Sequence, residues 1–224
     1  MSEIVVIPDQ CSVSIQFKVP FTFPEAQLEK EMQSRDFSVP GNQKILRVGP
    51  DGAQVSALHW VKGVDVLYLP TLGQLVCQGS NYESVAERSL ELNNMAESML
   101  GSGLKNALQW AELSAQARVR GTKPPSNCYN RLPRGPLVGS LNNILGRDVS
   151  HLGLRFYWSE QSELAEPLNS IAEWFDLTLN PFIPNPSYHA MSVVYRSKDI
   201  DSISSFTSGL EALGTTLVSE LEAL

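Results

Sequence analysis

The hydrophobic residues of this chain follow two different periods, and this restricts the fold more than any other feature. Residues 12–19 alternate apolar and polar side chains, which is typical of a strand with one buried face. From residue 82 to 100 the apolar residues instead recur at helical spacing, with glutamates on the other side. Amphipathic strands and helices bury their apolar sides against each other. The sequence therefore predicts an α+β fold.

Short turns between the strands of the first half indicate an antiparallel sheet. After a short polar helix over residues 25–35, strands are expected at 44–48, 54–61, 64–69 and 72–77. Pro50-Asp51-Gly52 and Lys62-Gly63 separate three of them, and Asp-Gly is a strong turn signal. The resulting prediction is an antiparallel sheet with helices packed on one face.

The second half predicts further elements of both kinds. Helices are expected at 104–120, 163–175 and 202–221, and strands at 151–158 and 190–196. Because only Gly101-Ser102-Gly103 separates the helix at 82–100 from the one at 104–120, the two should form an αα-hairpin.

The order of strands and helices suggests that the chain consists of two similar α+β halves. This hypothesis divides the chain into an N-terminal half (1–120), a Pro/Gly-rich basic connector (121–150) and a C-terminal half (151–224). The alternative is a single compact domain, since any α+β chain contains such a succession of elements.

Composition indicates a cytoplasmic protein. Cys11, Cys77 and Cys128 are few, odd in number and far apart, which favours a reducing compartment over a disulfide framework. The first residues lack the pattern of a signal peptide, and no apolar run approaches the ~18 residues of a membrane span. We therefore expect no membrane partner.

The net charge of −7 conceals a basic middle segment. Residues 113–159 carry seven basic side chains and one acidic side chain, whereas both flanking segments are acidic. The basic residues are Arg118, Arg120, Lys123, Arg131, Arg134, Arg147 and Arg155. Two interpretations stay open. The arginines could pair with acids of the flanking segments, or they could face an anionic partner.

Motifs for catalysis and cofactor binding are weak or missing in the sequence. No two of the three His and three Cys are close enough to form a zinc ligand pair, so we expect no metal and no cofactor. Cys128 lies among cations that could lower its pKa, and Gly101-Ser102-Gly103 precedes a predicted helix that could bind an anion. For both features a structural role is the better interpretation. The catalytic residues, if any, are unknown.

The remaining function is a non-enzymatic binding or regulatory one. We expect the basic Pro/Arg-rich loop to contact an acidic protein partner, with arginines as charged anchors and two tyrosines as aromatic ones. The predicted contact residues are Arg131, Arg134, Arg147, Arg155, Tyr129 and Tyr157. Phe156 and Trp158 are expected on the buried face of their strand. Nucleic-acid or nucleotide binding by the same loop, an enzyme with scattered site residues, and a homo-oligomer are the alternatives.

Overall fold

The computed structural model contains ten strands and five helices in the part of the chain that it describes. That part comprises residues 3–18, 25–35, 47–48, 54–55, 57–61, 63–69, 72–100, 108–132, 144, 153–160 and 171–224. The strands are β1 (Val5–Phe17), β2 (Arg47–Val48), β3 (Gln54–Val55), β4 (Ala57–Val61), β5 (Val64–Leu69), β6 (Gln74–Gly79), β7 (Leu108–Arg120), β8 (Leu154–Ser159), β9 (Trp174–Pro181) and β10 (Tyr188–Ser197). The helices are α1 (Glu25–Ser34), α2 (Tyr82–Leu100), α3 (Pro125–Tyr129), α5 (Ile200–Ser208) and α6 (Leu210–Ala223).

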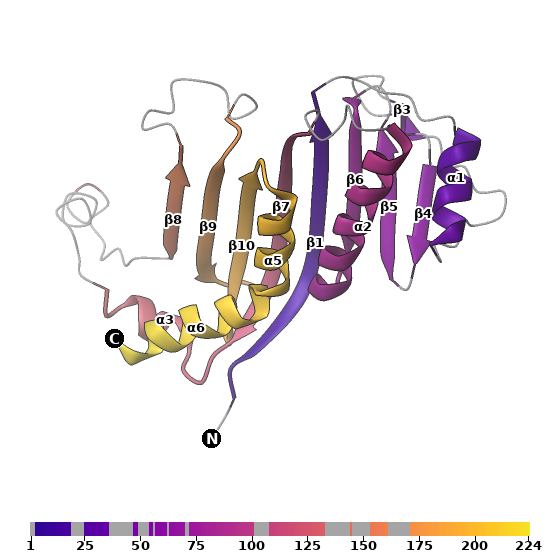
Figure 1. Ribbon diagram of the computed structural model, residues 1–224. Coiled ribbons are helices and arrows are strands. Elements are labelled where there is room, and N and C mark those ends of the chain that lie inside the picture. The colour runs from indigo at the N-terminus through magenta and orange to yellow at the C-terminus, as the bar shows by residue number, and fades with distance from the viewer. Residues whose placement is uncertain are drawn as a thin grey trace.

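Eight strands form one antiparallel sheet, and the longer helices lie on one of its faces (Figure 1). The strand order is β4-β5-β6-β1-β7-β10-β9-β8, and β2 pairs with β3 separately. Alternate residues of β1 and β7 are buried beneath α2, α5 and α6, for example Val13, Ile15 and Leu113. The opposite face carries polar residues such as Ser14 and Gln116. The α+β fold with an antiparallel sheet and helices on one face is thus confirmed.

The strand order is symmetric about the central β1–β7 pair. Outward from this pair lie β6, β5 and β4 on one side and β10, β9 and β8 on the other. Val13 of β1 lies opposite Leu113 of β7. On its other side, each of these two residues pairs with the next strand outward. Val13 lies opposite Cys77 of β6, and Leu113 lies opposite Tyr195 of β10. A pseudo-twofold axis therefore passes through the Val13–Leu113 pair.

Helix α2, which follows β6, and helix α5, which follows β10, are related by the same symmetry. Asn81 accepts a hydrogen bond from the Ser84 amide at the start of α2, and Asp199 caps α5 by accepting from the Asp201 amide. Ala86 and Ser204 each lie five residues after these caps, and the Ser204 hydroxyl donates to the Ala86 carbonyl at 3.2 Å. The two equivalent helices therefore cross on the axis, above the β1–β7 pair.

The predicted helix at 104–120 is wrong, because β7 occupies residues 108–120. Its alanines favour a helix, yet Ala111, Leu113, Ala115, Ala117 and Val119 are buried at every second position. Pairing with β1 on one side and β10 on the other decides the conformation. The predicted αα-hairpin is wrong for the same reason, and its Gly-Ser-Gly connection lies outside the described residues.

The other predicted elements agree more closely with the structure. The helices at 25–35 and 82–100 correspond to α1 and α2, and the predicted terminal helix corresponds to α5 and α6, divided at Gly209. The predicted helix at 163–175 falls largely outside the described residues. Its last two residues, Trp174 and Phe175, begin β9.

The division at residues 120 and 150 stays a prediction. The symmetric strand order groups β7 with β8–β10, whereas the predicted division assigns β7 to the N-terminal half. Among the described helices, none is long and apolar enough to cross a membrane.

Candidate functional site

The structure brings two of the six predicted contact residues together on the edge strand β8. Arg155 and Tyr157 lie on the face of this strand that points away from the helices, and both are exposed. Arg131 is exposed just after α3. Arg134 and Arg147 lie outside the described residues.

Tyr129, the sixth predicted contact residue, is buried in the core, which corrects the expectation of an exposed aromatic anchor. Its hydroxyl lies 2.9 Å from the Leu179 carbonyl, to which it donates, and 3.0 Å from Nδ1 of His189. Burial raises the pKa of Tyr129 and lowers that of His189 to about 4. Because Tyr129 donates its proton to Leu179, neutral His189 donates from Nδ1 to Tyr129.

The basic segment is partly neutralised within the chain. Arg155 binds the Asp176 carboxylate through two hydrogen bonds, from Nε at 2.9 Å and from a terminal nitrogen at 2.8 Å. Arg118 pairs with Asp9: its Nε donates to both carboxylate oxygens at 2.8 and 3.1 Å, and a terminal nitrogen lies 2.6 Å from one of them. These contacts agree with the interpretation that arginines of the middle segment pair with acids of the flanking segments.

Three consecutive aromatic side chains are exposed on β8. Phe156, Tyr157 and Trp158 are 44%, 41% and 51% exposed. Phe156 and Trp158 lie on the helix side of the sheet, as expected, but they are not buried. Trp158 lies opposite Phe175 of β9, and within the described residues no helix covers Phe156 or Trp158. Monomeric domains seldom leave such residues in contact with water unless the surface binds something.

The two exposed aromatics on the helix side continue into a larger aromatic surface. Phe175 contacts Tyr195 and Phe206 edge-on, with ring centroids 6.2 and 5.7 Å apart, and Tyr195 lies 5.0 Å from Phe206. We call this set, which spans β8, β9, β10 and α5, the aromatic surface. Its members are Phe156, Trp158, Phe175, Tyr195 and Phe206.

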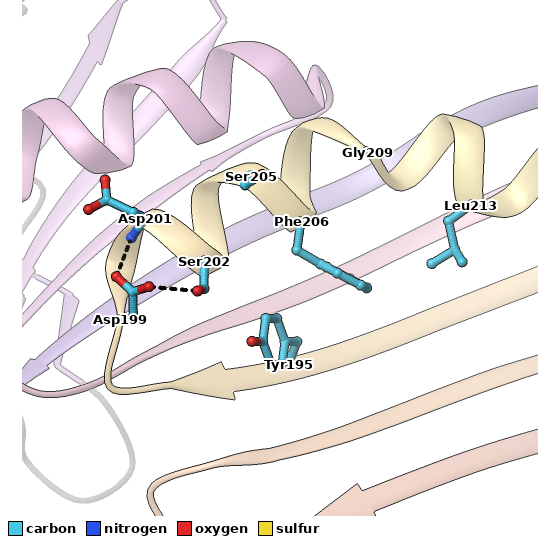
Figure 2. Close-up of a pocket in the computed structure, with 8 residues that line it drawn as sticks. All are labelled: Tyr195, Asp199, Asp201, Ser202, Ser205, Phe206, Gly209 and Leu213. Carbon is cyan, nitrogen blue, oxygen red and sulfur yellow. Dashed lines mark hydrogen bonds between the residues drawn. The ribbon is translucent and has the colours of Figure 1, made fainter.

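A groove of about 660 Å³ lies at the α5 side of the aromatic surface (Figure 2). Tyr195, Phe206 and Leu213 form its apolar wall, and Figure 2 shows their side chains on the sheet side of the helices. Toward the start of α5 the lining becomes polar, with Asp199, Asp201, Ser202 and Ser205. The groove is therefore apolar along its length and acidic at one end.

Asp199 at the acidic end has a structural role. It accepts hydrogen bonds from the Ser202 hydroxyl at 2.6 Å and from the Asp201 amide at 3.1 Å. The Ser202 bond and these amide contacts lower the pKa of Asp199, so its carboxylate stays ionised and suits a helix cap. Asp201 is exposed in the first turn. This arrangement offers a fixed negative charge, not a proton donor.

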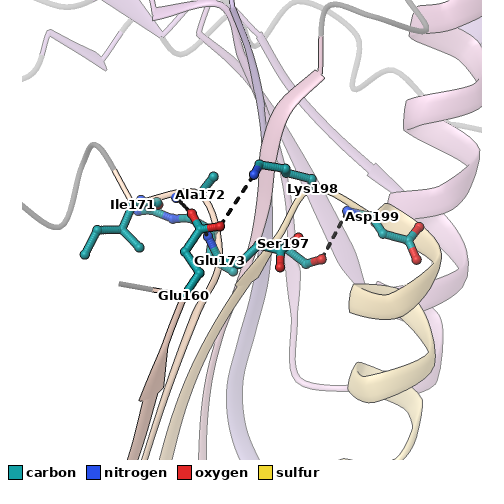
Figure 3. Close-up of polar contacts among 8 residues, drawn as sticks. Glu160, Ile171, Ala172, Glu173, Ser197, Lys198 and Asp199 are labelled. Atoms are coloured by element: carbon teal, nitrogen blue, oxygen red, sulfur yellow. Dashed lines mark hydrogen bonds and ion pairs between the residues drawn. The ribbon is translucent and has the colours of Figure 1, made fainter. Parts of the chain in front are cut away.

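Glu160, directly after β8, links the C-terminal end of this strand to the residues before β9 and α5 (Figure 3). Its carboxylate accepts hydrogen bonds from the amides of Ala172 and Glu173 at 3.1 and 3.3 Å, and it lies 3.6 Å from Nζ of Lys198. The start of β9 and the turn before α5 are thereby joined to the end of β8. These contacts fix the position of the aromatic surface relative to the acidic end of the groove.

Within the described residues, Cys128 and the possible metal ligands show no reactive arrangement. Cys128 is buried, and burial raises the pKa of its thiol, which disfavours the reactive thiolate. Within the same residues no three His, Cys, Asp or Glu side chains are grouped to hold a metal ion.

Comparison with known proteins gives no further guide. No protein-family model matches the sequence, and none of the curated proteins searched matches it. The assignment of a function therefore rests on the residues of the chain itself.

Sequence reasoning missed most of the aromatic surface. The alternation in β8 placed Phe156 and Trp158 correctly on the helix side, but it could not show that both side chains stay exposed there. The apolar spacing of residues 163–175 predicts a helix at Phe175, which instead lies in β9. Three adjacent aromatics in a short predicted strand were the available signal, because successive side chains point to opposite faces and cannot all lie on the buried one.

Proposed function

We propose that this chain is a non-enzymatic protein-binding module that contacts its partner through β8 and the aromatic surface. The observation that carries the proposal is the exposure of Phe156, Tyr157 and Trp158 side by side on an edge strand. Aromatic residues dominate the energetics of protein interfaces, and an edge strand adds unpaired backbone groups.

An acidic region in the partner remains part of this proposal. Asp176 already pairs with Arg155, so among the predicted arginines that the structure describes, the support for an acidic partner comes mainly from Arg131. A charge at the periphery of an interface, such as that of Arg131, affects the rate of association more than the affinity of the complex.

Site-specific photocrosslinking tests the proposal. A photoreactive phenylalanine analogue at position 158 should capture a discrete protein in native lysate, and the adduct should survive nuclease treatment. The same analogue at Ser12, on the opposite face of the sheet, should capture nothing comparable. Equal patterns at both positions, or no adduct at 158, would contradict the proposed function.

A matched pair of variants distinguishes specific binding at this surface from nonspecific hydrophobic binding. Trp158→Ser should abolish co-purification of the captured protein. Ile183→Ser should leave it unchanged, although Ile183 is 92% exposed, because it lies in the turn between β9 and β10. Equal loss in both variants would show that exposed apolar area, not this surface, recruits the protein.

A further inference from the structure

The symmetric strand order defines an N-terminal half from β1 to α2 and a C-terminal half from β7 to α6. These two halves differ in what covers the helix side of their outer strands. In the N-terminal half, α1 lies beside β4 on the same side of the sheet as α2 (Figure 1), and Met32 of α1 is fully buried in the core. The equivalent strand of the C-terminal half, β8, carries the exposed Phe156 and Trp158. Among the described residues, a helix therefore covers the outer strand of the N-terminal half, whereas none covers β8.

The short helix α3 does not fill this position. It reaches β9 where the Tyr129 hydroxyl bonds the Leu179 carbonyl. Leu179 lies opposite Leu154, at the beginning of β8, whereas Trp158 is near the opposite end of that strand. The described part of the chain thus leaves an apolar strip from Phe156 to the groove beside α5.

The charge at the end of this strip restricts what can lie on it. Asp199 and Asp201 line the groove at the start of α5, and both are exposed. Of the nearby described acids, Asp176 pairs with Arg155 and Glu160 with Lys198, so the charge at the groove comes from Asp199 and Asp201. A segment lying here is favoured if it has an apolar face and positive charge near Asp201.

We propose that the aromatic surface and its groove bind one amphipathic α-helix of a partner protein, with basic residues placed against Asp201. This inference rests on the proposed function and specifies the partner segment. The apolar face of the helix would lie on Phe156, Trp158, Phe206 and Leu213, in the position that corresponds to α1 in the N-terminal half. Because α1 occupies that position in the N-terminal half, the described residues offer one such site per chain.

A synthetic helix provides a direct test with the full chain. The probe is an amphipathic Leu/Lys peptide of about 18 residues, roughly five helical turns. Calorimetry should give one peptide bound per chain. A peptide of identical composition with a scrambled order has no apolar face and should bind at least about tenfold more weakly. Equal binding of the scrambled peptide would overturn the proposal.

Two variants locate the peptide. Trp158→Ser should weaken binding by about tenfold or more, while Ile183→Ser should leave it unchanged. Asp201→Lys should weaken the Leu/Lys peptide and strengthen a Leu/Glu peptide of the same pattern, because the charge at the end of the groove is reversed. If Asp201→Lys affects both peptides equally, the charge argument is wrong and the proposal falls.

Other occupants give different results. Sedimentation that shows a dimer of the wild type, dissolved by Trp158→Ser, would assign the surface to a second copy and overturn the proposal. If the crosslink at position 158 forms but no helical peptide binds, the binding function stands and the helix inference fails. If the peptide binds as expected but no crosslink forms, the inference survives as a binding mode while the proposed function is contradicted.

Discussion

His189 makes folding sensitive to pH through one buried side chain. Burial lowers its pKa from an ordinary 6.5 to about 4, and Tyr129 and Glu222 are the titratable groups that act on it. Below pH 6.5 the unfolded chain therefore binds a proton that the folded chain does not bind. We expect the free energy of unfolding to fall by about 2 kcal/mol between pH 6.5 and 4.5.

Urea denaturation of wild type and His189→Asn across this range checks the expectation. The variant is less stable at pH 7, but its stability should change much less between pH 6.5 and 4.5. The pKa of Glu222 is lowered by the Thr122 and Lys123 contacts, so its contribution is lost only below about pH 4.5 and stays outside the tested range. Parallel curves for the two proteins would assign the pH dependence to other groups.

Tyr129 offers a second prediction at the scale of a single residue. Tyr129→Phe removes the hydroxyl that bonds both Leu179 and His189, and leaves these buried groups without that partner. Thermal or urea unfolding should show a loss of about 1–3 kcal/mol. Binding of the amphipathic peptide should be unchanged at a temperature where the variant is folded. Weaker binding with unchanged stability would restore Tyr129 as a contact residue.

At the scale of elements, β7 shows what sequence periodicity can and cannot decide. Leu104, Ala107, Leu108, Ala111 and Ala115 fit a helical stripe, but buried and open positions alternate strictly from Ala111 to Arg120. Alanine has a high helix propensity, so local preference opposed the strand. The two flanking strands, both distant in sequence, outweigh that preference. Elements bounded by turns and long amphipathic helices such as α2 were predictable because their signals are local.

The alanines of β7 have a packing role that gives a prediction. Ala115 is 2% exposed on the face of β7 that α5 covers. Ala115→Leu adds volume between sheet and helix and should destabilise the protein by about 1–3 kcal/mol in urea denaturation. Gln116→Leu points to the opposite, exposed face and should change stability by less than about 0.5 kcal/mol. A larger effect at Gln116 than at Ala115 would contradict the observed register.

The start of α5 is a second element with a testable determinant. Asp199→Ala removes the acceptor for the Asp201 amide and the Ser202 hydroxyl, and should cost about 1 kcal/mol of stability. Asp201→Ala removes a charge in the first turn without removing the cap, so its effect should be smaller, at most a few tenths of a kcal/mol. Chemical denaturation of the two variants in low salt measures the difference. Equal losses would show that charge, not capping, stabilises this end.

The candidate site was predictable only in part, and for an identifiable reason. The sequence places Arg155 and Tyr157 on one face of a strand and Phe156 and Trp158 on the other, as the structure does. Burial, however, depends on which strand lies at the edge and where the helices end. Both are properties of the assembled sheet. Tyr129 was misplaced because α3 folds back onto β9, a contact that spans 50 residues.

On the scale of the whole molecule, the symmetric strand order shows where the described parts of the two halves differ. The axis through Val13 and Leu113 relates β4 to β8 and β5 to β9, so two equivalent positions exist beside the outer strands. In the N-terminal half α1 lies beside the outer strands, and in the C-terminal half aromatic side chains are exposed instead. The two halves share a framework and differ at the positions where a partner would bind.

The same symmetry predicts that the chain behaves as two subunits joined covalently. When the chain is cut between residues 104 and 105, the fragments should associate during co-expression, because β1 pairs with β7 along most of its length and α2 packs on α5. Each fragment expressed alone would expose a long edge strand and should aggregate. Leu113→Lys buries a charge in the interface and should prevent co-purification of the fragments, whereas Ser114→Lys, on the opposite exposed face, should not. Fragments that are each soluble, folded and monomeric would show that the halves are independent domains and that the central pair contributes little to the stability of either.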